Sequence, residues 1–266
     1  PLIVFFTALG FAIAGLADGP RDILFRLFEA LAHAMLRIVG WVLWVAPVGV
    51  FALAAGLAAN AGTGAIAALA HYIVTVSSMG LIILIAAYGV ARLGGGLALG
   101  RFARAVLPAQ AVAISTQSSL ASLPPMLESC RQLGLRSATA EFVLPLAVAI
   151  FRATSPAMNL AVAIYVAKMT GVELTPSVLI AGLAVALVTT IGSVSLPGSI
   201  SFVTSIGPIA LAMGVPIGPL ALLVAVEMLP DIVRTLANVT MNVALTGTVD
   251  RTGGDNAAEI PETARC

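Results

Sequence analysis

Charged residues are scarce in this chain. Only 9% of its 266 residues are Asp, Glu, Lys or Arg, whereas 60% are hydrophobic. A soluble domain carries about 25% charged residues, so this composition cannot form a surface that faces water. The sequence therefore predicts an integral membrane protein.

Cysteine, histidine and the motifs of common enzyme sites are also sparse. Cys130 and Cys266 form no motif, and we predict that both are free thiols. The two histidines, His33 and His71, lie far in sequence from the polar residues described below. No HExxH, CxxC, GxSxG or phosphate-loop pattern is present, and the positive residues are not clustered into a patch for nucleic acid. We therefore predict no enzyme activity, no cofactor and no nucleic-acid partner.

Long apolar runs occupy the first 100 residues. The chain begins inside such a run, at 1–16, without a methionine and without the basic region of a signal peptide. This start predicts the C-terminal part of a longer protein. A break at 17–20 and a turn at 60–64 separate further apolar segments, including a full span at 65–91.

Two later apolar segments are interrupted in the middle by Ser, Gly and Pro. They run over 102–133 and 176–213, with breaks at 115–125 and 192–199. Each is followed by a spanning segment with a polar interruption, at 141–168 and 217–249. Irregular backbone at membrane depth is tolerated only where protein or a water-filled cavity satisfies it, and paired interruptions indicate a transporter's midplane site. The alternative is two ordinary spans with Ser/Pro kinks. We predict an all-α membrane protein with transmembrane helices plus two re-entrant helical hairpins in an inverted repeat.

One stripe of polar residues lies inside the last apolar segment. Its four members have the spacing i, i+3, i+4 and i+7, which places them on one face of a helix: Asp231, Arg234, Thr235 and Asn238. An arginine at membrane depth costs about 2.5–3.5 kcal/mol on the insertion scale, and such residues are usually functional. The alternative is an internal Asp–Arg pair that only fixes helix packing. Two further polar residues on the same face favour a site for a polar ligand.

The distribution of arginine predicts the topology. Arginines gather near 21–26, 92–104 and 131–136 and at Arg251, whereas the loops near 62 and 214–216 have neither Arg nor Lys. Positively charged loops are cytoplasmic. We expect a multi-pass protein of the cell (inner) membrane with a polar cytoplasmic tail.

Four motifs together resemble a known family. They are Ser-Ser-Leu-Ala-Ser-Leu-Pro at 118–124, Phe-Val-Leu-Pro-Leu at 142–146, Ser-Leu-Pro-Gly at 195–198, and the polar stripe in 231–240. The chain resembles the C-terminal two-thirds of the dicarboxylate/amino acid:cation symporter family, which includes glutamate and aspartate transporters. The resemblance implies a homotrimer that moves its substrate by an elevator-type mechanism. It divides the chain into scaffold-type helices at 1–100, a transport domain at 101–250 and a tail at 251–266.

The resemblance also assigns roles to the polar stripe. Arg234 would bind the substrate side-chain carboxylate through two parallel hydrogen bonds, and Asp231 would bind its α-ammonium group. Thr235 and Asn238 would hydrogen-bond the ligand, with Asn238 at the α-carboxylate. The remaining substrate-binding residues implied by the resemblance are Ser119, Ser195, Pro197 and Gly198.

The sequence departs from the family at the sodium sites. Family members carry Asn-Met-Asp-Gly-Thr where this chain has residues 151–155, so Phe151 and Ala153 lack a side-chain oxygen, and Asn242 replaces an aspartate. We therefore predict no confident metal site and a sodium coupling that is lost or altered.

Arg152 brings a permanent positive charge to the same region. It is interpreted as a partner of Glu227 or Asp231, as a tethered cation in place of sodium, or as a second contact for a substrate carboxylate. Proton coupling through Glu227 or Glu141 is an open alternative to a structural role for these carboxylates.

The sequence predicts a secondary active transporter for an acidic amino acid or a C4-dicarboxylate. The alternative is a non-transporting membrane sensor or partner subunit that binds the same ligand. Loss of the cation motif favours the sensor, whereas retention of the whole polar stripe favours transport.

Overall fold

A computed structural model describes residues 9–192 and 199–258, and this part of the chain is helical without a strand. The prediction of an all-α fold is confirmed. Two compact units are present, Pro1–Gly56 and Leu57–Cys266, and each is described by itself.

The first unit contains a short helical segment at 9–14 and the beginning of α2 (Asp18–Leu93). The chain turns at Gly15 and Leu16, close to the predicted break at 17–20. The predicted turn at 60–64 is wrong, because α2 continues through these residues. Each glycine there costs a helix about 1 kcal/mol relative to alanine, and the alanine-rich sequence around it favours the helix.

In the second unit, α3 (Leu99–Thr116) and α4 (Leu123–Leu133) pack against one another and are joined by residues 117–122. This pair confirms the helix, tip and helix predicted at 102–133. The tip is shorter than predicted, because Pro124 and Pro125 lie in the first turn of α4. Proline is tolerated there since the N–H groups of a first turn have no partner within the helix.

A second pair is formed by α7 (Pro176–Gly192) and α8 (Ser199–Ala212), which also pack against one another. The tip predicted between them falls on 193–198, outside the described residues. The inverted repeat and the re-entrant position of both pairs in a membrane stay predictions.

Each helix pair is followed by an interrupted helix. After the first pair come α5 (Ser137–Leu146), a π-helical turn η1 (Ala147–Phe151) and α6 (Ser155–Thr170). After the second come α9 (Gly218–Leu223), a 3-10 turn η2 (Val224–Val226) and α10 (Met228–Ala258). The backbone is therefore irregular at 147–154 in the first segment and at 224–227 in the second, whereas the polar stripe of the second segment lies in the regular helix α10. Irregular turns of this kind are frequent at functional sites.

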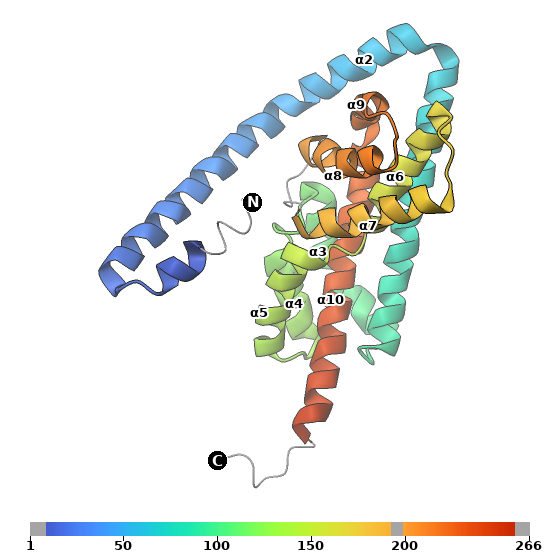
Figure 1. Cartoon of the computed structure of the whole chain (residues 1–266). Coiled ribbons are helices and arrows are strands. Elements are labelled where there is room, and N and C mark those ends of the chain that lie inside the picture. The colour runs from blue at the N-terminus through green and yellow to red at the C-terminus, as the bar shows by residue number, and fades with distance from the viewer. Residues whose placement is uncertain (1–8, 193–198, 259–266) are drawn as a thin grey trace. The chain divides into compact units, whose positions relative to one another are not determined.

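The second unit is organised around α10, which contacts α3, α4 and α5 and also η1 (Figure 1). One hydrophobic cluster packs residues of α10 with the first helix pair and α5, including Phe102, Met126 and Val239. Another packs α6, α7 and α8 with the end of α2, including Tyr72 and Met158.

The end of α2 approaches α10 very closely. A Cβ atom on Gly80 would lie 2.9 Å from Val233 Cγ1 and 3.1 Å from Met158 Sδ. Only glycine leaves room for this contact. The compact unit thus begins well before residue 101, where we predicted the transport domain to start; the division into scaffold and transport parts stays a prediction.

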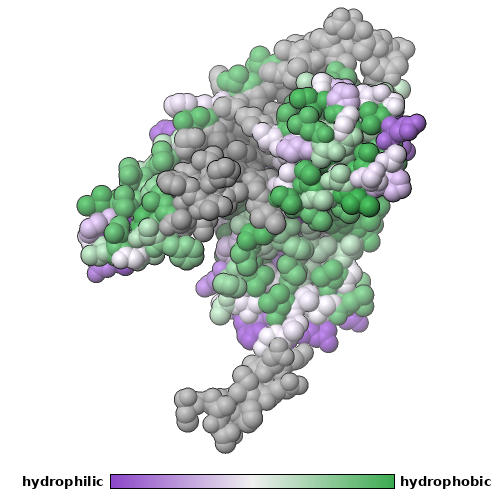
Figure 2. Space-filling view, viewed as in Figure 1, coloured by the Kyte–Doolittle hydropathy of each residue, from purple (hydrophilic) through white to green (hydrophobic). Residues whose placement is uncertain are grey.

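Apolar side chains also cover much of the outside of the second unit, as Figure 2 shows for one face. Within the described residues, Ala67–Leu93 and Ser137–Thr170 are helical stretches long and apolar enough to cross a membrane. A surface of this kind suits lipid rather than water.

Candidate functional site

The polar stripe lies on α10 and faces the interior of the second unit. Arg234 is 7% exposed and Asn238 3% exposed, and Thr235 is also buried. The Asp231 side chain is 20% exposed. The stripe is therefore enclosed by protein, and the carboxylate at its beginning is the most accessible part.

The guanidinium of Arg234 is held by three groups. Its Nη1 donates to Asn159 Oδ1 at 2.5 Å, and its Nη2 donates to Glu227 Oε1 at 2.7 Å. Its Nε lies 3.4 Å from Asp231 Oδ1, an ion-pair distance without a hydrogen bond among the described residues. These contacts fix the plane of the guanidinium and leave Nε unsatisfied.

Two residues of this network were missed in the sequence. Asn159 comes from α6, where it is a lone polar residue in an apolar stretch. A polar residue in such a stretch could have indicated a buried polar contact. Tyr72 comes from α2, is fully buried, and donates from its hydroxyl to Glu227 Oε2 at 2.6 Å. Tyr72 is 155 residues from Glu227, and no local pattern indicates such a partner.

Asn238 joins α10 to the interrupted helix. Its Oδ1 accepts a hydrogen bond from the backbone N–H of Thr154 at 3.0 Å. The first N–H groups of a helix have no intrahelical acceptor, so Asn238 satisfies one donor just before α6. Its side-chain oxygen is committed to this bond, and its amide Nδ2 is the atom that suits an anionic ligand.

Thr235 is committed in a similar way, because its hydroxyl donates to the Asp231 carbonyl at 2.9 Å. The same oxygen can still accept a hydrogen bond. Thr235 therefore suits a donor on a ligand better than an acceptor.

Arg152 follows η1 with a left-handed backbone, φ 30° and ψ 64°. Its side chain is half-buried and interacts electrostatically with Asp231 and Arg234. Of the interpretations of Arg152, an interaction with Asp231 agrees with this placement. The role of Arg152 toward a ligand or a cation stays a prediction.

The structure describes the tip of the first helix pair, at 117–122, and not the tip of the second. Ser119 is half-buried within 117–122, a turn held by hydrogen bonds from Ser122 Oγ to the Ser118 carbonyl and from the Ala121 N–H to Ser118 Oγ. Three other predicted binding residues lie outside the described residues: Ser195, Pro197 and Gly198. Their contribution to a site stays a prediction.

This arrangement is a buried arginine flanked by carboxylates and amides beside two interrupted helices. A model of the sodium:dicarboxylate symporter family matches residues 1–252. The chain belongs to this family. The family is one of transporters rather than enzymes.

Three relatives of this chain are named as bacterial transport proteins. It is 30% identical over 241 residues to the proton/sodium-glutamate symport protein of Bacillus subtilis (strain 168), covering 90% of this chain and 56% of the relative. It is 28% identical over 242 residues to the proton/glutamate-aspartate symporter of Escherichia coli (strain K12), covering 91% and 55%. It is 27% identical over 255 residues to the C4-dicarboxylate transport protein of Leptothrix cholodnii, covering 96% and 56%. The chain thus spans little more than half the length of these relatives.

The family description includes sodium, so the oxygens at the predicted sodium positions matter. Phe151 and Ala153 supply no side-chain oxygen. Asn242 Oδ1 is buried without a hydrogen-bond partner among the described residues and offers one neutral oxygen. A hard cation requires several oxygen ligands. The side chains at these three positions thus offer one neutral oxygen, fewer than a sodium ion requires, and the coupling ion stays a prediction.

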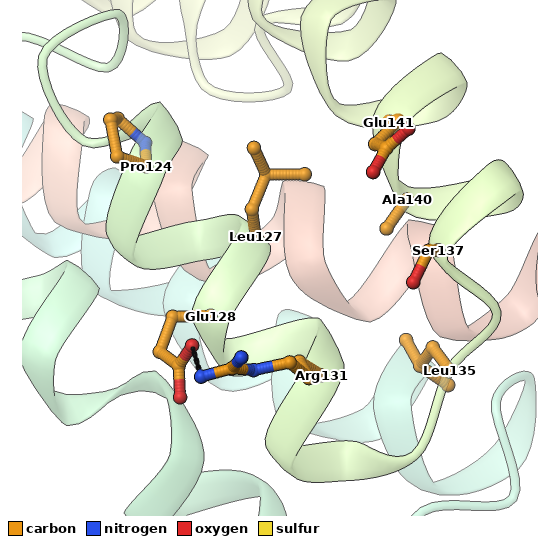
Figure 3. Close-up of a pocket in the computed structure, with 8 residues that line it drawn as sticks. All are labelled: Pro124, Leu127, Glu128, Arg131, Leu135, Ser137, Ala140 and Glu141. Carbon is orange, nitrogen blue, oxygen red and sulfur yellow. Dashed lines mark ion pairs between the residues drawn. The ribbon is translucent and has the colours of Figure 1, made fainter.

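A separate pocket of about 260 Å³ lies between α4 and α5 (Figure 3). Its lining includes Glu141 and Ser137 from α5 and an ion pair of 2.6 Å between Glu128 and Arg131 of α4. No residue of the polar stripe lines it. Glu141, one of the two carboxylates considered for proton coupling, therefore faces this pocket and not Arg234.

Proposed function

We propose that this chain carries the substrate site of a secondary transporter for an acidic amino acid or a C4-dicarboxylate. The observation that carries the proposal is the Arg234 guanidinium, which is buried and oriented by Asn159 and Glu227. A buried, fixed guanidinium is the preferred group for binding a carboxylate through two parallel bonds. The names of the relatives, which include glutamate, aspartate and C4-dicarboxylates, support this ligand class.

The neighbours of Arg234 match the rest of an acidic amino acid. Asp231, the more accessible carboxylate, and the Thr235 oxygen are suited to an α-ammonium group, and the Asn238 amide nitrogen is suited to an α-carboxylate. A plain dicarboxylate would bind Arg234 and Asn238 with its two carboxylates, and Asp231 would then interact with Arg152 rather than with the ligand. The rest of the site would come from the two tips, through Ser119, Ser195, Pro197 and Gly198.

We propose that sodium coupling is lost or altered and that a proton on Glu227 replaces it. Two positive side chains, Arg152 and Arg234, balance two carboxylates, Asp231 and Glu227, so an arriving anion brings excess negative charge into a buried site. Burial of unbalanced charge is costly. A proton on Glu227 restores the balance, and binding of substrate and binding of a proton therefore favour each other.

The remaining parts of the proposal concern the whole protein. We propose a homotrimer in the cell membrane, with scaffold helices in 1–100, an elevator-type transport domain in 101–250 and a cytoplasmic tail at 251–266. The contacts of Tyr72 with Glu227 and of Gly80 with Val233 support a close packing of the end of α2 against the transport domain.

The test is uptake of L-aspartate, L-glutamate and succinate by the purified protein in liposomes. A sodium gradient and a pH gradient are imposed separately, at the same membrane potential. We expect accumulation driven by the pH gradient and unchanged by sodium. A steep dependence on sodium would overturn the proposed coupling, and absence of both binding and uptake of all three acids would overturn the proposed function.

A second candidate is a membrane sensor or partner subunit that binds the ligand without transporting it. The absence of suitable oxygens at Phe151 and Ala153 favours it, because loss of a driving ion need not remove ligand binding. Binding by calorimetry without flux in the liposome assay would decide for the sensor.

A further inference from the structure

The two oxygens of the Glu227 carboxylate are bound by different partners. Oε1 accepts from Arg234 Nη2 at 2.7 Å, whereas Oε2 accepts from the Tyr72 hydroxyl at 2.6 Å. A carboxylate beside an arginine frequently binds it with both oxygens in parallel. Here the tyrosine holds the second oxygen, and Glu227 contacts Arg234 through one oxygen only.

Tyr72 is held rigidly in this position. It is fully buried in a hydrophobic cluster with Val76 and Met158. Its ring meets Tyr165 edge-on, with centroids 5.3 Å apart, and the Tyr165 hydroxyl is itself bonded to the Ala68 carbonyl at 2.8 Å. The packing around the Tyr72 ring therefore keeps its hydroxyl at hydrogen-bond distance from Glu227.

The guanidinium of Arg234 has binding capacity beyond these contacts. Each terminal nitrogen carries two N–H groups. Among the described residues, Nη1 has one acceptor, Asn159, and Nη2 has one, Glu227. One N–H on each terminal nitrogen is thus not used by these contacts. A second Glu227 oxygen on Arg234 would take one more of these donors.

We propose that Tyr72 is a positioning residue that keeps the second oxygen of Glu227 away from Arg234 and so preserves binding capacity for a substrate carboxylate. Without the hydroxyl, Glu227 turns both oxygens to Arg234 and competes with the substrate. This inference rests on the proposed function, in which Arg234 binds a substrate carboxylate.

The first experiment is Tyr72→Phe, which removes the hydroxyl and keeps the ring. We expect the Kd for L-aspartate and for succinate to rise about tenfold, or about 1.4 kcal/mol, with little change in the maximal uptake rate. The matched control is Tyr88→Phe, which removes a hydroxyl that accepts from Gln110 Nε2 at 3.3 Å, outside the Arg234 and Glu227 network, and should leave both Kd values unchanged. Binding is measured on monodisperse protein, with thermal unfolding recorded for each variant.

A double-mutant cycle separates positioning from packing. In the Glu227→Gln background the competing carboxylate is gone, so adding Tyr72→Phe should change Kd less than twofold. An equal tenfold rise in both backgrounds, or an unchanged Kd in Tyr72→Phe alone, would overturn the inference. If the unchanged protein binds neither acid, the proposed function itself fails, and this outcome is distinct from the other two.

Discussion

Replacing Arg234 by lysine keeps the positive charge and removes the geometry on which the proposed site depends. In the structure the guanidinium reaches Asn159 from one nitrogen and Glu227 from another, at 2.5 and 2.7 Å. A lysine ammonium is a single compact group and cannot keep both contacts while offering two parallel bonds to a ligand. Arg234→Lys therefore changes binding through shape and hydrogen bonding, with the formal charge unchanged.

The magnitude follows from one lost charge-assisted hydrogen bond to the ligand. Such a bond contributes about 1.5–3 kcal/mol, which corresponds to a rise in Kd of about 10- to 150-fold at 1.4 kcal/mol per factor of ten. Isothermal titration of L-aspartate and succinate into purified protein measures it. The matched control is Arg104→Lys, an exposed arginine bonded to the Gly100 carbonyl, which should bind normally.

A rise smaller than threefold in Arg234→Lys, with normal folding, would refute the reasoning. It would mean that Arg234 serves the structure through Glu227 and Asn159 and does not touch the ligand. The internal-pair interpretation of the polar stripe would then be the better one.

Three further predictions test coupling and stability. Glu227→Gln should abolish accumulation driven by a pH gradient and retain exchange of labelled for unlabelled substrate, since the proton carrier is lost while Arg234 remains; accumulation at the original level would contradict proton coupling. Arg152→Met combined with Ala153→Asp removes a fixed cation and adds a charged oxygen. Sodium should then lower the Kd for the acidic substrate about fivefold or more, within the usual range of coupling energies. A Kd that does not respond to sodium would show that these two positions do not suffice to restore a sodium site. Arg136→Ala removes hydrogen bonds of 2.7 and 2.6 Å to the Asp250 side chain and carbonyl. It should lower the free energy of unfolding by about 1 kcal/mol, measured by thermal unfolding in detergent. An unchanged free energy of unfolding would show that other contacts fix this end of α10.

The parts of the fold set by local pattern were predictable. The spacing of Asp231, Arg234 and Asn238 placed them on one helix face, and the serines at 118–122 marked the tip between α3 and α4. Both signals act within a few residues, where helix periodicity and turn chemistry operate. The turn predicted at 60–64 failed because glycine in an alanine-rich helix is tolerated at modest cost.

The contacts that orient the site were not predictable in the same way. Asn159 and Tyr72 are 75 and 155 residues from the groups that they bind. Asn159 looks like an isolated polar residue in an apolar helix, and Tyr72 is one of several polar residues that begin at His71. Only the packing of α2, α6 and α10 shows which group each of the two binds. The commitment of Asn238 Oδ1 to the Thr154 backbone was hidden for the same reason.

The absent side chain at Gly80 has a mechanical consequence. With only hydrogen on this residue, α2 rests directly on Val233 of α10 and on Met158, and no compressible layer separates them. Any rotation of α10 that accompanies ligand entry should therefore move the end of α2 as well, because the two helices are in direct contact. A fluorophore attached near Val74, which is exposed on α2, would report such a rotation from a position remote from the ligand.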